Sequence, residues 1–499
     1  MYNFFTFETE NNKYIFDNIS GEVFYFDELF LDILNNYKKY KRDDLIKKLS
    51  CKYDINDINS KCEYVEQLIS QGFFYRSSFN DIRKKENYEK ALLKGFNSQL
   101  FLILTHECNL RCKYCIYSDN YPHTITYDNK NMTFDVAKKA VDSYIKLYKN
   151  KLVNGYRNNP IINFYGGEPL LQFKLIKKVV EYCKSYDYDF QFFITTNGVI
   201  MNDEIIKLLI DNNFRVTISL DGNKENHDRN RLSKDNKRTF EIIINNLKKL
   251  QQEKLKRGVS QPISFNCCYD DYSNMIDIID FFDKNEKELN CSSVMFSEIS
   301  PYDTYYSEYC QSMHEKGYLS NSSDTLKTTY NKLFNMYKNN LINNEELKMT
   351  MKFLFAPLFY TKNLPKGDQG LLGNACVPGG KIAVSPDGNF YLCEKMNEKY
   401  PIGNIENGLE WEKIENVITQ YLDIKDKKCS DCNISRFCDV CYAHFSMNDC
   451  KDQMFNEQFC RDKKRYIPKI LTSLYSLLEK NPKCLDADTY RVIDNSFTR

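Results

Sequence analysis

The middle of the chain alternates short apolar runs with longer amphipathic stretches. The apolar runs predict strands near residues 99–105, 161–165, 190–195, 214–220, 262–268 and 292–297. Apolar residues at helical spacing predict helices near 134–149, 172–185, 203–212, 238–254 and 273–287. Alternation of this kind implies parallel strands joined by crossover helices. The sequence therefore predicts an α/β fold, a partial (β/α)6 TIM-type barrel over residues 99–298, with its active-site loops at the carboxyl ends of the strands.

The segments on either side of this barrel have other patterns. Residues 1–78 begin with strand-like runs at 3–9, 13–17 and 22–26, and three helical patterns follow them. This order predicts a winged-helix-like domain, whose exposed sheet edge suits the addition of an extended peptide. The remaining expectations are a polar linker at 79–98, a helical bridge at 299–375, a cysteine-rich domain at 376–462, and a C-terminal helix and tail at 463–499.

Composition limits the partners and the compartment. The chain has 499 residues, a net charge of +1 and 42% hydrophobic residues, so it predicts neither a nucleic-acid nor a membrane partner. Its first residues lack a basic region before an apolar core, so we expect no secretory signal and a cytoplasmic protein. In that compartment, 19 cysteines indicate metal or redox sites rather than disulfides.

Three of these cysteines lie on a loop that follows the first predicted barrel strand. They are Cys108, Cys112 and Cys115. Three thiolates can hold three corners of a [4Fe–4S] cluster, which leaves the fourth iron open to another ligand. A zinc site is an alternative at this point, because His106 or His123 would supply the fourth ligand that structural zinc requires.

The spacing CxxxCxxC, with Tyr114 before the third cysteine, resembles the cluster loop of the radical S-adenosylmethionine (SAM) family. The resemblance implies that SAM chelates the open iron and that Tyr114 packs near the adenine. It continues at the ends of the next three strands, where a GGEP segment, Thr196-Asn197 and Ser219-Leu220-Asp221 stand. An ordinary strand-to-helix turn also explains GGEP, and a solvated charge also explains Arg231. The implied SAM-binding residues are Tyr114, Gly166, Gly167, Glu168, Thr196, Asn197, Ser219, Asp221 and Arg231.

A second group of cysteines begins at Cys376. The turn signal Pro386-Asp387-Gly388-Asn389 predicts a hairpin that brings Cys376 and Cys393 together. The later CxxC pairs would also suit zinc. With the barrel motifs, the whole set resembles the SPASM domain, which carries auxiliary [4Fe–4S] clusters in radical SAM enzymes that act on peptides. The spacing departs from the common form, because two residues rather than three separate Cys438 and Cys441. The resemblance implies a distal cluster on Cys429, Cys432, Cys438 and Cys460, with Cys450 as the alternative last ligand, and a proximal cluster with an open iron on Cys376, Cys393 and Cys441.

The N-terminal turn at 17–23 is similar to one in the precursor-recognition element of enzymes that mature ribosomally made peptides. The closest likeness is to thioether-forming maturases of Cys-rich peptides, the ranthipeptide and sactipeptide enzymes. This implies three [4Fe–4S] clusters, SAM and an external electron donor. It also implies a precursor peptide whose leader binds the N-terminal domain and whose cysteine binds the proximal cluster, with no catalytic residue beyond the clusters. Formylglycine-type sulfatase maturation, carbon–carbon crosslinking and a zinc-binding scaffold are the alternatives.

Overall fold

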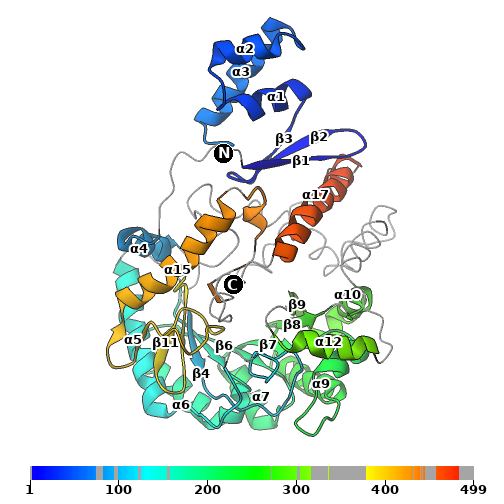
Figure 1. The fold of residues 1–499 in the computed structure, drawn as a ribbon. Helices are drawn as coiled ribbons and strands as arrows, with labels where there is room; N and C mark the ends of the chain where they lie inside the picture. The colour runs from blue at the N-terminus through cyan, green and yellow to red at the C-terminus, as the bar shows by residue number, and fades with distance from the viewer. Residues whose placement is uncertain are drawn as a thin grey trace.

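The computed structural model describes residues 3–74, 82–94, 99–121, 125–153, 158–270, 272–299, 304–315, 335, 378–430, 432–438, 440, 442–443, 457–480 and 482. Figure 1 shows the N-terminal domain at one end and the barrel at the other, with α15 (Trp411–Cys429) and α17 (Glu457–Lys480) between them. Within the described ranges, no helix is both long enough and apolar enough to cross a membrane.

The barrel has the predicted strand and helix order. Its six parallel strands are β4 (Gln99–Ile103), β5 (Ile161–Tyr165), β6 (Gln191–Thr196), β7 (Arg215–Ser219), β8 (Ile263–Tyr269) and β9 (Cys291–Glu298). The predicted crossover helices are α5 (Phe134–Val153), α6 (Phe173–Cys183), α7 (Asp203–Asp211), α9 (Phe240–Lys256) and α10 (Met275–Lys284). Three short elements were not predicted: η1 (Pro169–Gln172), α8 (Lys224–Asn230) and α11 (Glu286–Leu289). The helix α12 (Tyr306–Glu315) lies in the predicted helical bridge.

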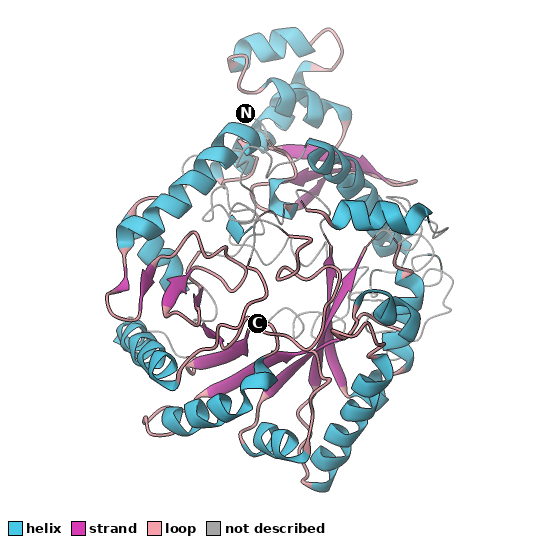
Figure 2. Cartoon of the chain, turned by 60° about the horizontal axis from the view of Figure 1, so that its bottom comes forward, coloured by secondary structure: helices cyan, strands magenta, loops and turns pink. Residues whose placement is uncertain are grey.

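The two faces of the barrel strands differ in burial. In β6, Phe192, Ile194 and Thr196 are buried, whereas Phe193 and Thr195 are half-buried. Figure 2 shows the helices on the outside of the curved sheet. Because successive side chains of a strand point to opposite faces, the buried set faces the helices and the half-buried set faces the barrel interior.

The predicted hairpin is present and extends the barrel sheet. Strand β10 (Lys381–Val384) pairs antiparallel with β11 (Asn389–Tyr391), and Gly388 in the turn between them has φ +82°. Strand β10 also pairs parallel with β4, and β12 (Gly403–Asn404) and β13 (Gly408–Leu409) continue the sheet beyond β11. The cysteine-rich region therefore begins inside the sheet of the barrel, not in a separate layer.

The N-terminal domain has three antiparallel strands followed by three helices, in the predicted order. The strands are β1 (Phe4–Glu8), β2 (Lys13–Asp17) and β3 (Val23–Tyr25), with β2 in the centre. The helices are α1 (Glu28–Asn36), α2 (Arg42–Leu49) and α3 (Ile55–Ser70). One sheet face, with Ile15, packs on these helices, and the other, with Phe5, Phe7 and Phe16, joins the main hydrophobic core.

The segment predicted as a polar linker contains a helix, α4 (Lys85–Lys94). Tyr88 on this helix is 4% exposed, and its ring centroid lies 5.2 Å from that of Trp411 in α15. The linker is therefore packed against the region that follows the hairpin. Most of the predicted bridge at 299–375 lies outside the described residues.

Candidate active site

The loop with Cys108, Cys112 and Cys115 follows β4 and is held from both sides by backbone hydrogen bonds. On one side, Gly167 N donates to Thr105 O at 2.8 Å, and Glu168 N donates to Glu107 O at 2.9 Å. On the other side, residues 111 and 113 donate to the carbonyls of residues 232 and 230, at 2.7 and 3.1 Å. The loop thus lies at the carboxyl ends of the strands, where the barrel fold was expected to place it.

The two glycines after β5 are required by this packing. A Cβ on Gly166 would lie 2.4 Å from Thr105 O, and a Cβ on Gly167 would lie 2.2 Å from Glu107 O. Gly166 also has φ +136°, a backbone conformation that other residues rarely adopt. The sequence implied that Gly166 and Gly167 contact SAM. The structure shows that both glycines also pack against the backbone of the cysteine loop. The contact of Gly166 and Gly167 with SAM remains a prediction.

The thiols of the loop lie in surroundings that suit thiolate ligands. Cys108 and Cys112 are each 7% exposed, and burial raises the pKa of both, that of Cys112 to about 12. The Leu110 N–H points at Cys108 Sγ from 3.4 Å, and the side-chain amide of Asn197 does so from 3.7 Å. The Arg231 charge beside Cys112 acts against the rise in its pKa. Donors and a cation around thiols favour the thiolate form that a cluster needs, so the residues fit the group.

Glu168 links the ends of β5 and β6. It is fully buried, and its carboxylate accepts hydrogen bonds from Leu170 N at 3.0 Å, Thr196 Oγ1 at 2.7 Å and Asn197 N at 2.8 Å. The Asn197 amide then donates to Asn109 Oδ1 at 2.8 Å, inside the cysteine loop. The side chains of Glu168, Thr196 and Asn197 thus position the loop, and their contact with SAM remains a prediction.

Tyr114, Asp221 and Arg231 form one buried network. An Arg231 N–H donates to the Tyr114 hydroxyl at 2.6 Å, and this hydroxyl donates to Asp221. Asp221 also accepts from Cys268 N at 3.0 Å. Arg231 is 7% exposed, and its buried Nε has no hydrogen-bond partner within the described residues. The structure excludes Arg231 as a freely solvated charge, and a carboxylate ligand would satisfy its remaining donor.

Ser219 ends β7 on the half-buried inner face of the barrel. Sequence reasoning missed other residues of that face. Thr195, rather than the buried Thr196, faces the interior, and the Oδ1 atoms of Asn163 and Asn266 are buried without a hydrogen-bond partner in the described chain. The alternation of side chains along each predicted strand is the signal that would have found them.

His106 was one candidate for a zinc ligand. It is fully buried, and its ring nitrogens lie 3.1 Å from Asp128 Oδ1 and 3.3 Å from Glu398 Oε1. The other candidate, His123, lies outside the described residues. Among the residues that are described, no group of three or more His, Cys, Asp or Glu side chains is close enough to hold a single metal ion. A cubane cluster spaces its thiolates more widely than a single ion does.

Cys393 follows β11 and is half-buried. Its thiol donates to Glu394 Oε2 at 3.1 Å, and burial raises its pKa. Burial, and then the charges of Glu394, Cys115 and Cys393, raise the pKa of Tyr165, the last residue of β5. Cys376 and Cys441, the other predicted proximal ligands, and the alternative Cys450 lie outside the described residues.

The four predicted distal cysteines come from three elements. Cys429 is the last residue of α15, Cys432 and Cys438 flank η3 (Ser435–Phe437), and Cys460 lies in the first turn of α17. Burial, then the neighbouring Cys438, Cys432 and Cys460, raise the pKa of Cys429 to about 12. The four thiols therefore lie near one another and form a donor set that fits a four-thiolate cluster.

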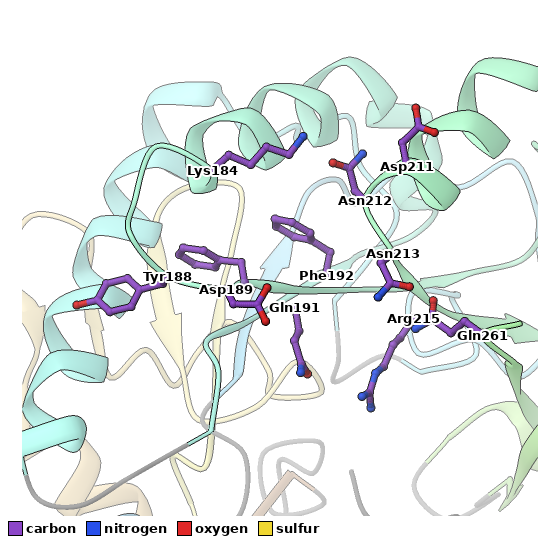
Figure 3. A pocket seen from close by; sticks show the side chains of 11 residues that line it. Lys184, Tyr188, Asp189, Gln191, Phe192, Asp211, Asn212, Asn213, Arg215 and Gln261 are labelled. Atoms are coloured by element: carbon purple, nitrogen blue, oxygen red, sulfur yellow. The ribbon is translucent and has the colours of Figure 1, made fainter. Parts of the chain in front are cut away.

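A pocket of about 370 Å³ lies at the opposite end of the barrel strands (Figure 3). Its lining includes Gln191 and Arg215, the first residues of β6 and β7, together with Phe192. The cysteine loop follows the carboxyl end of β4, so this pocket is separate from the site described above.

Residues 102–282 match the family model of the radical SAM superfamily. This segment has the radical SAM fold. The match contains the cysteine loop and the ends of β5, β6 and β7, and the family implies a [4Fe–4S] cluster and SAM.

Relatives extend the similarity beyond this domain. The cysteine-type anaerobic sulfatase-maturating enzyme of Clostridium novyi strain NT is 27% identical over 363 residues, 68% of this chain and 86% of that protein. The radical SAM cyclopropyl synthase TigE of Paramaledivibacter caminithermalis is 22% identical over 449 residues, 87% of each chain. A solved structure of anSMEcpe with bound AdoMet has a TM-score of 0.55 at 18% identity, and the match covers 80% of this chain and 98% of that one. The fold is thus the radical SAM α/β fold over most of the chain.

Proposed function

We propose that the chain is a radical SAM peptide maturase that forms thioether links from cysteine sulfur to a carbon of a ribosomally made, Cys-rich peptide. The observation that carries the proposal is the position of Cys393. Its hairpin pairs directly with β4, the strand that leads into the three-cysteine loop. Cys393 itself follows β11 beside Lys381, level with the amino end of β4. The segment after it returns to the three-cysteine loop, where Glu398 Oε1 lies 3.3 Å from His106 Nε2, so the chain from Cys393 to Glu398 joins the two cysteine regions.

The proximal cluster is the site that would hold the substrate sulfur. With Cys376, Cys393 and Cys441 as its three thiolate ligands, one iron would remain for a peptide thiolate, the natural incoming ligand. Tyr165 ends β5, and the charges of both Cys115 and Cys393 raise its pKa, so this side chain would fill the space between this iron and the first cluster. It would keep water out of the path between the two sites.

When bound, the cofactors would supply the oxidation: SAM and one electron would give methionine and 5′-deoxyadenosine, whose added hydrogen comes from a peptide carbon. Closing the carbon–sulfur bond would release the thiol proton, and one electron would pass to the auxiliary cluster. The chain's own residues hold the reactants. Asn197 fixes the cysteine loop, and Arg231 offers its buried Nε–H to the SAM carboxylate. The inner-face amides of Asn163 and Asn266 offer acceptors inside the barrel.

The N-terminal domain would bind the precursor's leader. Among the described strands, β3 pairs only with β2, so its outer edge is open to an added strand. Tyr25 on β3 is 69% exposed beside that edge. The similarity to TigE covers 87% of this chain and so extends beyond the radical SAM segment.

Formylglycine-type sulfatase maturation is the second candidate. The similarity to the C. novyi enzyme favours it, with 27% identity over 68% of this chain. In that case the proximal cluster would be fully ligated by protein and no link would form.

The test is mass spectrometry of a Cys-rich peptide encoded beside the gene, after anaerobic incubation with the reconstituted chain, SAM and a reductant. Thioether formation predicts a loss of two hydrogen atoms per link and one cysteine per link that no longer reacts with an alkylating agent. Hydrogen loss with every cysteine still reactive would instead indicate carbon–carbon crosslinking. A peptide aldehyde would indicate sulfatase-type oxidation, and either result would reject the proposal.

The variant Cys393→Ser sharpens this test. It should keep SAM cleavage and lose crosslinking, because the first cluster does not use Cys393. The matched control is Cys51→Ser, since Cys51 is an exposed thiol of the N-terminal domain.

A further inference from the structure

The turn after β2 has a conformation that directs one side chain away from its own domain. Asp17 is fully buried, and its carboxylate accepts from Ile19 N at 3.0 Å and from Ser20 N and Oγ at 3.1 and 2.6 Å. Gly21 closes the turn with φ +78° and donates its N–H to Asp17 O at 2.8 Å. This local network is complete without Asn18, so the side chain of Asn18 is available for contacts elsewhere.

Asn18 makes those contacts with the loop between Cys432 and Cys438. Its Nδ2 donates to Ser435 Oγ at 2.7 Å and reaches Cys432 O at 3.4 Å. Its Oδ1 accepts from Arg436 N at 2.9 Å, and Nδ2 also donates to Asn3 Oδ1 at 2.9 Å. Asn18 is 5% exposed, so these hydrogen bonds are shielded from water.

The residues on either side reinforce this attachment. Arg436 is 7% exposed and donates to Ile19 O at 3.0 Å. The Phe437 ring lies 5.0 Å from that of Phe16 and 6.4 Å from that of Phe5, both on the N-terminal sheet. All three residues of η3, the turn between the two cysteines, thus contact the N-terminal domain.

The same domain is attached a second time through α17, the helix that carries Cys460. At its far end, Glu479 accepts from Thr9 Oγ1, Asn12 Nδ2 and Tyr14 OH at 2.7, 2.8 and 2.7 Å. Figure 1 shows α17 running up to the hairpin of β1 and β2. The two attachments lie at opposite ends of these strands, so the domain is fixed in orientation over the distal cysteines.

We propose that Asn18 is a positioning residue for the distal auxiliary cluster, and that the N-terminal domain is a built-in part of that site. The domain holds the Cys432–Cys438 loop in the conformation that presents its two thiols beside Cys429 and Cys460. This inference rests on the proposed function, in which these four cysteines bind a cluster. It deepens that function, because the module that binds the peptide leader also shapes a redox centre.

The test measures iron and sulfide per chain, and the electron paramagnetic resonance signal of the reduced clusters, in the full-length chain with Asn18→Ala. The expected result is loss of the iron of one cluster and of its signal, with the radical SAM cluster's signal kept. Asn59→Ala is the matched control, because Asn59 lies half-buried on α3 and its side chain donates to Ile55 O within the same helix at 3.0 Å. Asn18→Ala with wild-type iron and an unchanged signal would overturn the inference.

Two further variants keep the result interpretable. Asn18→Asp retains the acceptor for Arg436 N and loses both donors, so it should fold and bind less distal-cluster iron; a wild-type signal in this variant would also overturn the proposal. Cys432→Ala tests the cluster itself. If it leaves the iron content unchanged, the assignment of the distal cluster fails, which is distinct from a failure of the role of Asn18.

Discussion

The two cysteine regions are built by different means. The loop with Cys108, Cys112 and Cys115 is held mainly by main-chain hydrogen bonds to residues 167–168 and 230–234, with one side-chain bond from Asn197, all within the barrel. The loop with Cys432 and Cys438 is held by side chains of a domain that lies more than 400 positions earlier in the sequence. The first clamp is local to one fold, whereas the second exists only when two domains are assembled.

The difference determines which changes each site tolerates. A loop held by main-chain hydrogen bonds tolerates most side-chain substitutions, but it does not tolerate added bulk where two backbones meet. A loop held by side chains depends on individual hydrogen bonds, each of which contributes about 0.5–1.5 kcal/mol to stability. The first site should therefore fail at its glycines, and the second at its polar and aromatic contacts.

The largest effect is expected from Gly167→Ala. Its Cβ would lie 2.2 Å from Glu107 O, a backbone atom that cannot move without displacing the cysteine loop. We expect a loss of about 3 kcal/mol or more in the free energy of unfolding, together with loss of the radical SAM cluster. Denaturant unfolding and the iron content of the chain measure both effects.

Gly258→Ala is the control for this substitution. Gly258 has φ +67° with nothing within 4 Å of an added Cβ, so it isolates the cost of a left-handed backbone, about 1–2 kcal/mol. Equal losses in the two variants would contradict the role of close packing at Gly167.

A smaller effect is expected from Asn197→Ala. This variant removes the amide that points at Cys108 Sγ from 3.7 Å and bonds Asn109 at 2.8 Å. The cluster should still assemble, with a lower reduction potential and a rate of SAM cleavage reduced by about 10–100-fold. Protein-film or mediated potentiometry measures the potential, and 5′-deoxyadenosine release measures the rate.

Asn285→Ala is the control for this substitution, because it also removes a side-chain amide that donates a hydrogen bond. Asn285 caps α10 through its own helix, with Nδ2 donating to Phe281 O at 2.7 Å. A potential that is the same in Asn197→Ala, Asn285→Ala and the wild type would show that Asn197 does not act on the cluster.

The smallest effect is expected from Glu479→Gln, at the second attachment of the N-terminal domain. Burial acts to raise the pKa of Glu479, but its hydrogen bonds from Asn12, Tyr14, Thr9 and Asn11 outweigh burial and lower it to about 2. Because the carboxylate is only half-buried and water screens its hydrogen bonds, we expect a loss of only about 1 kcal/mol at neutral pH.

The contribution of Glu479 to the free energy of unfolding should depend on pH. A lowered pKa stabilises the folded state above the ordinary value of 4.5, and that contribution is lost as the pH falls from there towards 2. The difference in denaturant midpoint between wild type and Glu479→Gln should therefore shrink below pH 4.5. A difference that grows on acidification would contradict the assignment.

Much of the barrel was predictable because its signals are local. The apolar runs and the helical spacing placed all six parallel strands and all five main crossover helices, and GGEP and Asn197 were located at strand ends from the sequence alone. Their partners were not predictable, because neither the contact of Gly167 with Glu107 O nor that of Asn197 with Cys108 Sγ leaves a pattern along the chain. Which of the adjacent Thr195 and Thr196 faces the barrel interior was also not predictable, because strand register decides between neighbouring residues.

The sequence by itself determined the alternating elements of the barrel, the hairpin at Pro386–Gly388 and the residue types that can ligate iron. Period-2 and period-3.6 patterns and cysteine spacings are read within a few residues, so no distant contact is needed to recognise them. Only the tertiary structure decided that β10 joins β4, that Arg231 is buried against Tyr114, and that Asn18 reaches the Cys432–Cys438 loop. These contacts join segments that are far apart in the chain. The sequence holds many residues of the same types, and only folding decides which of them meet.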